Sequence, residues 1–258
     1  MIEARDLRYR YDEGGDVLEG VGFRIGAGEK VVLLGANSSG KSTLLKILDG
    51  LIFPAGGSYS YKGKPVTRSA LRRREAARAF RKEVALLFQN PDAMLFHPTV
   101  YDEIAFGPRQ FGLEDVDGRV RRWAEILGVA GRLDRPPFHL SGGEKQKVCL
   151  AAILAVDPEV LLLDEPTSHM DPRSTGWLVD FLGDWSGTTV TTTHNLSLAA
   201  ELGDRTLVLG EDHGLIYDGK VGSLLEDKEK LLAANLMHAH DHRHGGISHR
   251  HYHTHDWD

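Results

Sequence analysis

Apolar residues along the chain fall in short runs that are separated by glycines and by segments with helical spacing. Residues 30–34 form a run of β-branched residues and leucine that ends at a glycine, and apolar positions recur at helical spacing over residues 42–51. Further apolar runs follow at 84–88, 160–163, 188–193 and 206–209, with helical patterns between several of them. Because buried strands that alternate with helices are typical of parallel sheets, the pattern predicts a mainly parallel α/β sheet.

The middle and the end of the chain interrupt this alternation. Residues 91–157 are mostly helical in pattern, which predicts a helical subdomain inserted into the sheet. After about residue 223 no further strand is expected. From residue 238 the chain is rich in histidine and poor in apolar residues, which predicts a mobile tail. We therefore expect a main domain over residues 1–225 and a C-terminal extension over 226–258.

The composition of the 258 residues is that of an ordinary globular protein, with 41% hydrophobic and 26% charged residues. A formal net charge of −6 argues against a general nucleic-acid binder, since neutralising phosphates takes a clustered excess of Lys and Arg. The single cysteine, Cys149, rules out an internal disulfide and is expected to be buried. No secretory signal is expected at the N-terminus. No apolar stretch approaches the ~20 residues that cross a bilayer, so a membrane role is expected to need a partner.

A glycine-rich loop carries the first chemical signal. It reads Gly35-Ala-Asn-Ser-Ser-Gly40-Lys41-Ser42 and matches G-x-x-x-x-G-K-[ST] between a predicted strand and a predicted helix. Backbone N–H groups and a helix N-terminus attract phosphate there. Lys41 is expected to reach the β- and γ-phosphates, and Ser42 to bind Mg²⁺. The residues expected to hold the nucleotide at this loop are Gly35, Asn37, Ser38, Ser39, Gly40, Lys41, Ser42 and Thr43.

Two adjacent carboxylates, Asp164 and Glu165, end the apolar run of residues 160–163. Successive side chains of a strand point to opposite sides, so the two are expected to have different roles. One would hold Mg²⁺ and the other would orient the attacking water. In a nucleotide-binding α/β sheet, ligands lie beyond the carboxyl ends of the strands, where this pair falls.

A second anion site is predicted at Leu140-Ser141-Gly-Gly-Glu144, where Ser141 and Glu144 form a capping box at a helix start. Glycines immediately inside a cap cost helix stability, about 1 kcal/mol each, so bare backbone N–H groups are expected to be needed there. With this segment the sequence resembles the ATPase subunits of ABC transporters, whose signature is LSGGE, over roughly residues 2–222. The resemblance implies an ABC ATPase domain with a P-loop NTPase, RecA-like core, an antiparallel β edge and the inserted helical subdomain.

The resemblance also implies roles for individual residues. Two copies, as a homodimer or with a close paralogue, would enclose ATP between the phosphate loop of one and Ser141, Gly142, Gly143 and Glu144 of the other. Glu165, His194, Gln89 and Lys41 would be catalytic, and Mg²⁺ would be held by Ser42, Gln89 and Asp164. Tyr11 would stack on adenine, and the alternative, almost equal in weight, is that it is an ordinary tyrosine of a strand. Asp171 would lie in the D-loop. Ser38, where many members have glycine, and His169 depart from the family pattern.

Residues 90–108 resemble the energy-coupling-factor branch of the family, which imports vitamins and transition metals. Phe96, Val100, Ile104 and Phe106 are expected to give an apolar surface near Gln89 for a membrane subunit, with some of the four in the core. Thr99 and Asp102 form another capping box, so part of this pattern is a helix start.

Eight of the thirteen histidines lie in the C-terminal tail: His238, His240, His242, His244, His249, His251, His253 and His255. Neutral imidazole binds nickel, copper, zinc and related ions, so the tail is expected to bind a transition metal such as Ni²⁺, Co²⁺ or Zn²⁺. An expression tag and a metal-free solubilising tail are the alternatives.

Together these features predict a peripheral ATPase on the cytoplasmic face of the membrane that energises nickel or cobalt import through integral membrane subunits, with ATP and Mg²⁺ and without nucleic acid. A vitamin importer with a metal-storing or metal-sensing tail remains open. So do a soluble ABC switch protein without transport and a metal-binding protein whose nucleotide site is regulatory.

Overall fold

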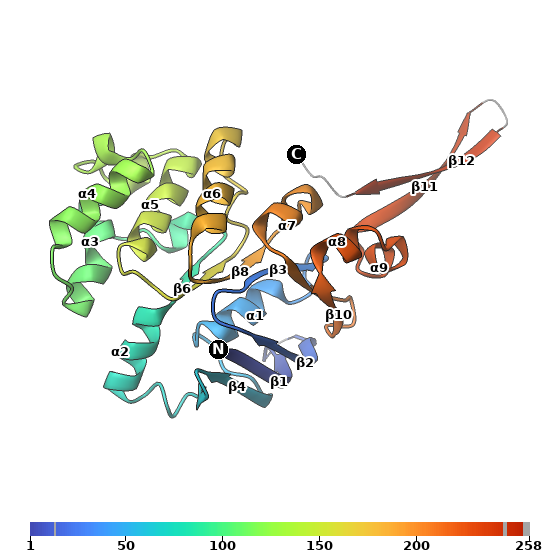
Figure 1. Ribbon diagram of the computed structural model, residues 1–258, viewed down its shortest axis with the longest axis horizontal. Coiled ribbons are helices and arrows are strands. Elements are labelled where there is room, and N and C mark those ends of the chain that lie inside the picture. Colours follow the sequence, from blue (N-terminus) through green and yellow to red (C-terminus); the bar gives the residue numbers. More distant parts are fainter. Residues whose placement is uncertain (13, 245–246, 255–258) are drawn as a thin grey trace. The chain divides into compact units, whose positions relative to one another are not determined.

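A computed structural model of the chain describes residues 1–12, 14–244 and 247–254 (Figure 1). Its contacts divide the chain into two compact units. The first unit consists of Met1–Thr67 and Val190–Asp258, and the second of Arg68–Thr189.

An antiparallel sheet begins the first unit. Its strand order is β2-β1-β4-β5, with β1 (Ile2–Arg10), β2 (Asp16–Ile25), β4 (Gly56–Tyr61) and β5 (Lys64–Pro65). In register, Ile2 lies opposite Ile25 on one side and Tyr61 on the other. Ile2 and Ala4 are buried and Arg5 is exposed, so one face of β1 packs into the core. This sheet is the antiparallel edge that the family resemblance implies.

A second, mainly parallel set of strands also lies in the first unit's core. The strand order is β10-β9-β3-β8, where β3 (Lys30–Gly35) pairs in parallel with β9 (Arg205–Leu209), and β10 (Leu215–Lys220) pairs antiparallel with β9. β8 (Thr188–Thr192) straddles the division between the units. The helices of this unit are α1 (Lys41–Leu48), α7 (Leu196–Leu202), α8 (Val221–Leu225) and α9 (Lys228–Ala233).

In the second unit, most of the helices come, along the chain, between two strands that pair in parallel. Its strand order is β8-β7-β6, and β6 (Val84–Leu87) pairs in parallel with β7 (Val160–Leu163), all four residues of which are fully buried. Figure 1 shows α3, α4 and α5 packed beside one another in green, and these three contact each other pairwise. The helices are α2 (Arg74–Glu83), α3 (Val100–Phe111), α4 (Val116–Ile126), α5 (Gly142–Leu154) and α6 (Pro172–Asp184), with 3₁₀ turns at Pro91–Ala93, Ala130–Arg132 and Pro137–His139.

The expected α/β architecture is confirmed. The runs at 30–34, 84–88, 160–163, 188–193 and 206–209 are the strands β3, β6, β7, β8 and β9. The helical segment predicted over 91–157 is present between β6 and β7 as three helices and three 3₁₀ turns. The strongest patterns were those of strands buried on both faces, which read as continuous apolar runs.

The prediction of no strand after residue 223 is wrong. The chain there forms β11 (Met237–His244) and β12 (Ile247–Thr254), which pair antiparallel as a separate two-stranded sheet (Figure 1). The sequence has Gly245-Gly246 between two alternating segments, which is typical of a hairpin. The alternating positions of these strands are histidines and not apolar residues, so the hydrophobic pattern did not indicate a strand here.

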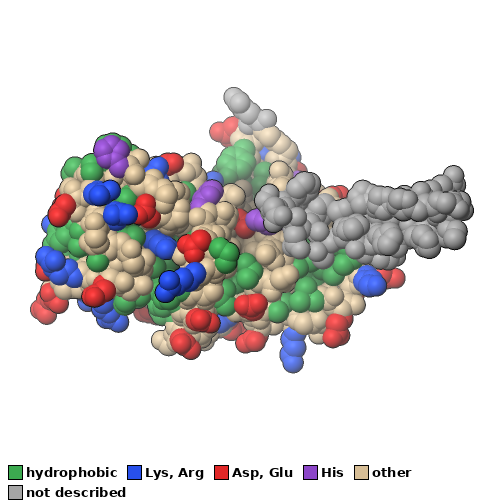
Figure 2. All heavy atoms as spheres, turned by 90° about the horizontal axis from the view of Figure 1, so that it is seen from above, with side chains coloured by type: hydrophobic (Ala, Val, Ile, Leu, Met, Phe, Trp, Pro, Cys, Tyr) green, Lys and Arg blue, Asp and Glu red, His purple; other side chains and the backbone are tan. Residues whose placement is uncertain are grey.

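Among the described residues, no helix combines the length and the apolar character that crossing a bilayer requires. On the face drawn in Figure 2, basic and acidic side chains of the described residues are interspersed, with apolar ones between them. A surface of mixed sign does not gather positive charge into one patch.

Candidate active site

The glycine-rich loop lies in the first unit, between the buried strand β3 and α1. Gly40 is the N-cap of α1 and has a left-handed backbone, with φ 103°. A Cβ on Gly35 would lie 2.6 Å from Leu209 O, and one on Gly40 would clash with Val17 O. Only glycine fits at these two positions, because the loop packs closely against the backbone of β9 and of β2.

The polar side chains of the loop fit a phosphate site. Lys41 Nζ donates hydrogen bonds to the carbonyls of Gly35 at 2.7 Å and Ala36 at 2.9 Å, which holds the ammonium group across the loop. Ser39 Oγ is buried and has no hydrogen-bond partner among the described residues. A buried hydroxyl without a partner, next to a helix N-terminus and a lysine, is a cradle that a phosphate group completes.

Ser38, which departs from the family pattern, has a left-handed backbone with φ 67°. For a residue other than glycine this conformation costs roughly 1–2 kcal/mol. The conformation gives a physical reason for glycine at this position in similar sequences. Because Ser38 is exposed, its side chain has room in this conformation.

Tyr11 lies beside the phosphate loop within the first unit. Its hydroxyl is 3.3 Å from Thr43 Oγ1, and its ring packs edge-on against Tyr9 with centroids 4.9 Å apart. The residue is 42% exposed, so part of its side chain is accessible next to the loop. Stacking on a base needs an accessible aromatic ring.

His194 follows the end of β8 and precedes α7. Asn195 caps α7 by accepting hydrogen bonds from Ser197 N at 2.8 Å and Leu198 N at 3.3 Å. Asn195 N in turn donates to Thr193 Oγ1 at 3.1 Å. His194 is therefore held between a strand end and a capped helix.

The adjacent carboxylates Asp164 and Glu165 lie in the second unit, directly after β7, and are 6% and 7% exposed. Asp164 N donates to Leu87 O of β6 at 2.9 Å, which extends the strand pairing to the carboxylate. Glu165 has a left-handed backbone with φ 46°, and its carbonyl accepts hydrogen bonds from Ser168 N and Oγ at 3.2 and 2.9 Å. Strain of this kind in a buried carboxylate is common at functional sites.

Gln89 is exposed in the loop after β6. The loop is anchored on both sides of it. Phe88 N lies 3.4 Å from Met94 Sδ, and Asn90 Oδ1 accepts from Asp92 N at 3.0 Å to cap the following 3₁₀ turn.

Beyond Gln89 the chain presents an aromatic surface made of Phe96, His97 and Phe106. The Phe96 ring lies 5.7 Å from Phe106 and 4.5 Å from His97, between centroids. Phe96 is 69% and Phe106 39% exposed. Of the four apolar residues expected here, Val100 and Ile104 are fully buried, because they lie on the inner side of α3.

Glu103 holds this aromatic surface and was missed by the sequence reading. It is 5% exposed, and its Oε2 accepts hydrogen bonds from Phe96 N at 2.9 Å and His97 N at 2.8 Å. Its Oε1 lies 3.2 Å from His97 Nδ1. The acidic first turn of α3 indicated only helix capping, which Thr99 and Asp102 provide, so nothing local distinguished Glu103.

The predicted capping box at α5 is confirmed. Ser141 Oγ accepts from Glu144 N at 3.3 Å, and Glu144 Oε2 accepts from Ser141 N at 3.0 Å. Arg132 Nε also donates to Glu144 Oε1 at 2.9 Å. The hydrogen bond from the Ser141 backbone, followed by that from Arg132, lowers the pKa of Glu144 to about 2.

The two glycines at the start of α5 have different surroundings. A Cβ on Gly143 would lie 2.8 Å from His169 O, whereas one on Gly142 would be 3.9 Å from its nearest neighbour, His169 Cβ. Gly143 therefore allows the close approach of the chain around His169, a role that phosphate binding alone does not require. Gly142 is exposed and its backbone is accessible.

Asp171 caps α6, since Oδ1 accepts from Ser174 N at 3.0 Å and Oδ2 from Ser174 Oγ at 2.6 Å. These hydrogen bonds lower its pKa. The start of α5 and residues 168–171 thus lie side by side in the second unit. Tyr11, the phosphate loop and His194 belong to the first unit, and Gln89, the carboxylates and α5 to the second.

Within the described part of the chain, no group of three or more His, Cys, Asp or Glu is placed to hold a metal ion. The side chains of the eight tail histidines, His238 to His255, lie outside the described residues. The predicted tail site therefore consists of side chains that the structure does not describe.

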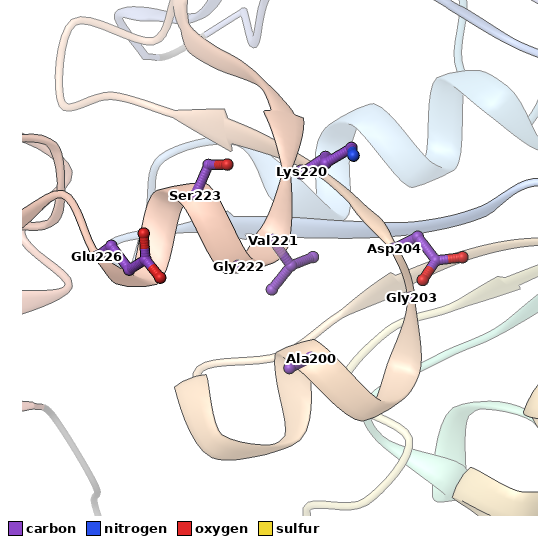
Figure 3. Close-up of a pocket in the computed structure, with 8 residues that line it drawn as sticks. All are labelled: Ala200, Gly203, Asp204, Lys220, Val221, Gly222, Ser223 and Glu226. Atoms are coloured by element: carbon purple, nitrogen blue, oxygen red, sulfur yellow. The ribbon is translucent and has the colours of Figure 1, made fainter.

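A cavity of about 500 Å³ in the first unit is formed around α8 and the end of α7 (Figure 3). It is lined by Ala200, Gly203, Asp204, Lys220, Val221, Gly222, Ser223 and Glu226. None of the predicted site residues lines it. The cavity is therefore separate from the phosphate loop.

The sequence and structure are similar to known proteins. The ABC transporter family model matches residues 18–168. The chain is 42% identical over 253 residues to a protein of Methanosarcina acetivorans named provisionally as an ABC transporter ATP-binding protein, covering 95% of this chain and 92% of that protein. It is 38% identical to the energy-coupling factor transporter ATP-binding protein EcfA of Methanocaldococcus jannaschii, covering 92% and 85% of the two chains. CbiO1 of Clostridium perfringens, part of the transporter complex CbiONQ, superposes with a TM-score of 0.74 at 29% identity, covering 91% and 94% of the two chains.

Proposed function

The chain belongs to the ABC transporter family as an ATP-binding and ATP-hydrolysing subunit, and from this premise we propose that it energises the import of nickel or cobalt through membrane partners. Relatives that include EcfA and CbiO1 support a place in the energy-coupling-factor branch. The observation that carries the choice of cargo is the group of eight histidines near the C-terminus, since imidazole suits nickel and cobalt.

We assign nucleotide binding to the loop between β3 and α1. Backbone N–H groups around Gly40 and the N-terminus of α1 would bind the phosphates, and Lys41 would neutralise their charge. Ser42 and Asp164, with Gln89, are the residues that would hold Mg²⁺. When bound, Mg²⁺ would neutralise charge on the phosphate oxygens. Tyr11 would stack on the adenine.

Hydrolysis would depend on positioning and charge. Glu165 would orient the attacking water and accept its proton, and its buried position after β7 keeps the carboxylate away from bulk water. His194 would contact the γ-phosphate from the start of α7. The left-handed backbone of Glu165 supports a functional role, because strain persists where the surrounding structure maintains it.

ATP-binding domains of this family dimerise and pair with membrane subunits. In this chain, Ser141, Gly142, Gly143 and Glu144 would bind the phosphate held by a second copy. The exposed Gly142 and the confirmed cap of α5 support this role, since a capped helix start offers ordered N–H groups.

The aromatic surface of Phe96, His97 and Phe106 would receive an apolar helix of the membrane subunit. Phe96 lies on a loop that makes three contacts to Glu103, and Phe106 lies on α3. These two exposed phenylalanines form a pre-ordered apolar site, which lowers the entropic cost of binding. The protein would accordingly be peripheral, on the cytoplasmic face of the membrane.

Uptake of radiolabelled nickel and cobalt tests the proposal. Cells that express the chain with its membrane subunits should accumulate one of the two metals, and Lys41→Ala should abolish accumulation. Lys46→Ala, which removes another lysine from α1, is the matched control and should leave uptake unchanged. Full uptake by the Lys41→Ala variant would contradict the assignment of Lys41 to the binding of phosphate. ATP hydrolysis without uptake of either metal would contradict the cargo.

A vitamin importer with a metal-storing tail is the second candidate. The same histidines also fit this candidate, because a tail can bind metal as a store while the transporter carries another cargo. In that case vitamin uptake would depend on Lys41, and metal uptake would be absent although the chain binds metal.

A further inference from the structure

The hairpin of β11 and β12 sets histidine opposite histidine three times in succession. Its antiparallel register pairs His238 with His253, His240 with His251, and His242 with His249. A seventh histidine, His244, lies opposite Ile247 at the next alternate position. The eighth, His255, lies outside the described residues.

These seven positions share one face of the hairpin. Directly opposite positions of an antiparallel pair lie on the same face, and so do positions two residues apart along a strand. The intervening pairs, which include Ala239 with Tyr252 and Asp241 with Arg250, make up the other face and contain no histidine. The register therefore sorts the histidines completely onto one side of the described strands.

This sorting depends on the register. A slip of one residue would set histidines opposite the residues that now flank them and would end the pairing. The pair Asp241 and Arg250 supports the observed register, because opposite charges in directly opposite positions stabilise a strand pair.

We propose that this histidine face is a binding site for divalent transition-metal ions, in which two adjacent cross-strand pairs supply the ligands of one ion. Opposite Cβ atoms of a strand pair are about 4.5–5.5 Å apart, and positions two residues along a strand about 6.8 Å apart. Four imidazoles attached at such spacing form a ligand set of the kind that nickel, copper and zinc bind. The site rests on the register alone and remains whether the transporter carries a metal or a vitamin.

The central pair, His240 and His251, is the pair to change in a test of this proposal. It belongs to both groups of four histidines that adjacent pairs can form. Without it, the pairs His238–His253 and His242–His249 are separated by four residues along each strand. Moving this one pair to the other face therefore breaks every four-histidine group, while the other five histidines of the face keep their positions.

A composition-neutral variant makes this move. Ala239→His, His240→Ala, His251→Tyr and Tyr252→His together exchange neighbours on each strand, so the histidine count is unchanged. We expect the full-length variant to bind Ni²⁺ and Zn²⁺ at least about tenfold more weakly in titration calorimetry, because losing even outer-shell support costs a metal site that much. Exchanging Arg243 with His244 is the matched control, since His244 has no histidine opposite, and it should change affinity little.

Equal affinity of the exchanged and native chains would overturn the proposal, since a tail without a fixed register is indifferent to such an exchange. Native chain that binds no more metal than a full-length variant with all seven histidines changed to Asn would overturn it as well. ATP hydrolysis by each variant checks that the chain outside the hairpin is folded. The variant His240→Gln with His251→Gln gives a second measurement and should weaken binding to the same extent.

Discussion

Cys149 lies on α5 and is 1% exposed, with Sγ 3.7 Å from the carbonyl of Pro91. Burial raises the pKa of its thiol to about 12, because a thiolate is poorly solvated in the apolar interior. The native chain should therefore resist iodoacetamide at pH 8, and the same chain in urea should react rapidly. Mass spectrometry follows the label. Fast incorporation of one equivalent into the native chain would contradict this burial.

Phe96 and Phe138 offer a matched comparison at the residue scale, since both are phenylalanines that are 69% exposed. Only Phe96 belongs to the aromatic surface held by Glu103. Phe96→Ser should reduce co-purification with the membrane subunits several-fold, as truncation of an aromatic anchor does, and Phe138→Ser should not. Equal losses for the two variants, measured from detergent-solubilised membranes, would argue against docking at Phe96.

At the scale of elements, the cap of α5 gives a pH dependence with a defined sign. The pKa of Glu144 falls from its ordinary 4.5 to about 2 in the folded chain. A lowered folded-state pKa contributes stability that is complete above the unfolded value and is lost as the pH falls towards the folded one. The contribution of Glu144 should therefore be constant above about pH 5 and shrink between pH 4.5 and 2.

Urea denaturation of native chain and Glu144→Gln across this pH range measures the effect. The difference in free energy of unfolding between them should narrow as the pH drops below 4.5. Glu125→Gln, at an exposed position of α4, is the control and should show no such narrowing. A difference that stays constant down to pH 3 would mean that the carboxylate of Glu144 is not held by the cap.

At the scale of the whole molecule, a change at Glu165 should affect both ATP hydrolysis and the dimerisation of the chain. Glu165→Gln should bind ATP like the native chain but hydrolyse it at least about 100-fold more slowly, the usual cost of losing a general base. Light scattering with Mg²⁺ and ATP should then detect a trapped dimer. Lys41→Ala should neither bind ATP nor dimerise. Full ATP turnover by the Glu165→Gln variant would contradict the assignment of Glu165 as the residue that orients the attacking water. An ATP-bound monomer would contradict dimerisation through α5.

Much of the fold and of the candidate site could be predicted because its signals are local. The strands β3 and β7 are continuous apolar runs, and the loop after β3 and the cap of α5 are short patterns whose hydrogen bonds form within a few residues. Left-handed backbone at Ser38 and Glu165 carried no such signal, since neither residue type usually adopts it. Glu103 looked like any acidic residue of a first helical turn.

The sequence by itself determined the glycine-rich loop and the cap of α5, because each pattern is complete within a few neighbouring residues. It also determined the order of buried strands and inserted helices. Tertiary structure alone decided that Val100 and Ile104 are core while Phe96 is exposed, that Gly143 makes room for His169, and that histidine positions of β11 pair in register with those of β12. These features depend on contacts between segments distant in the chain, and a pattern along one segment contains no information about its partner.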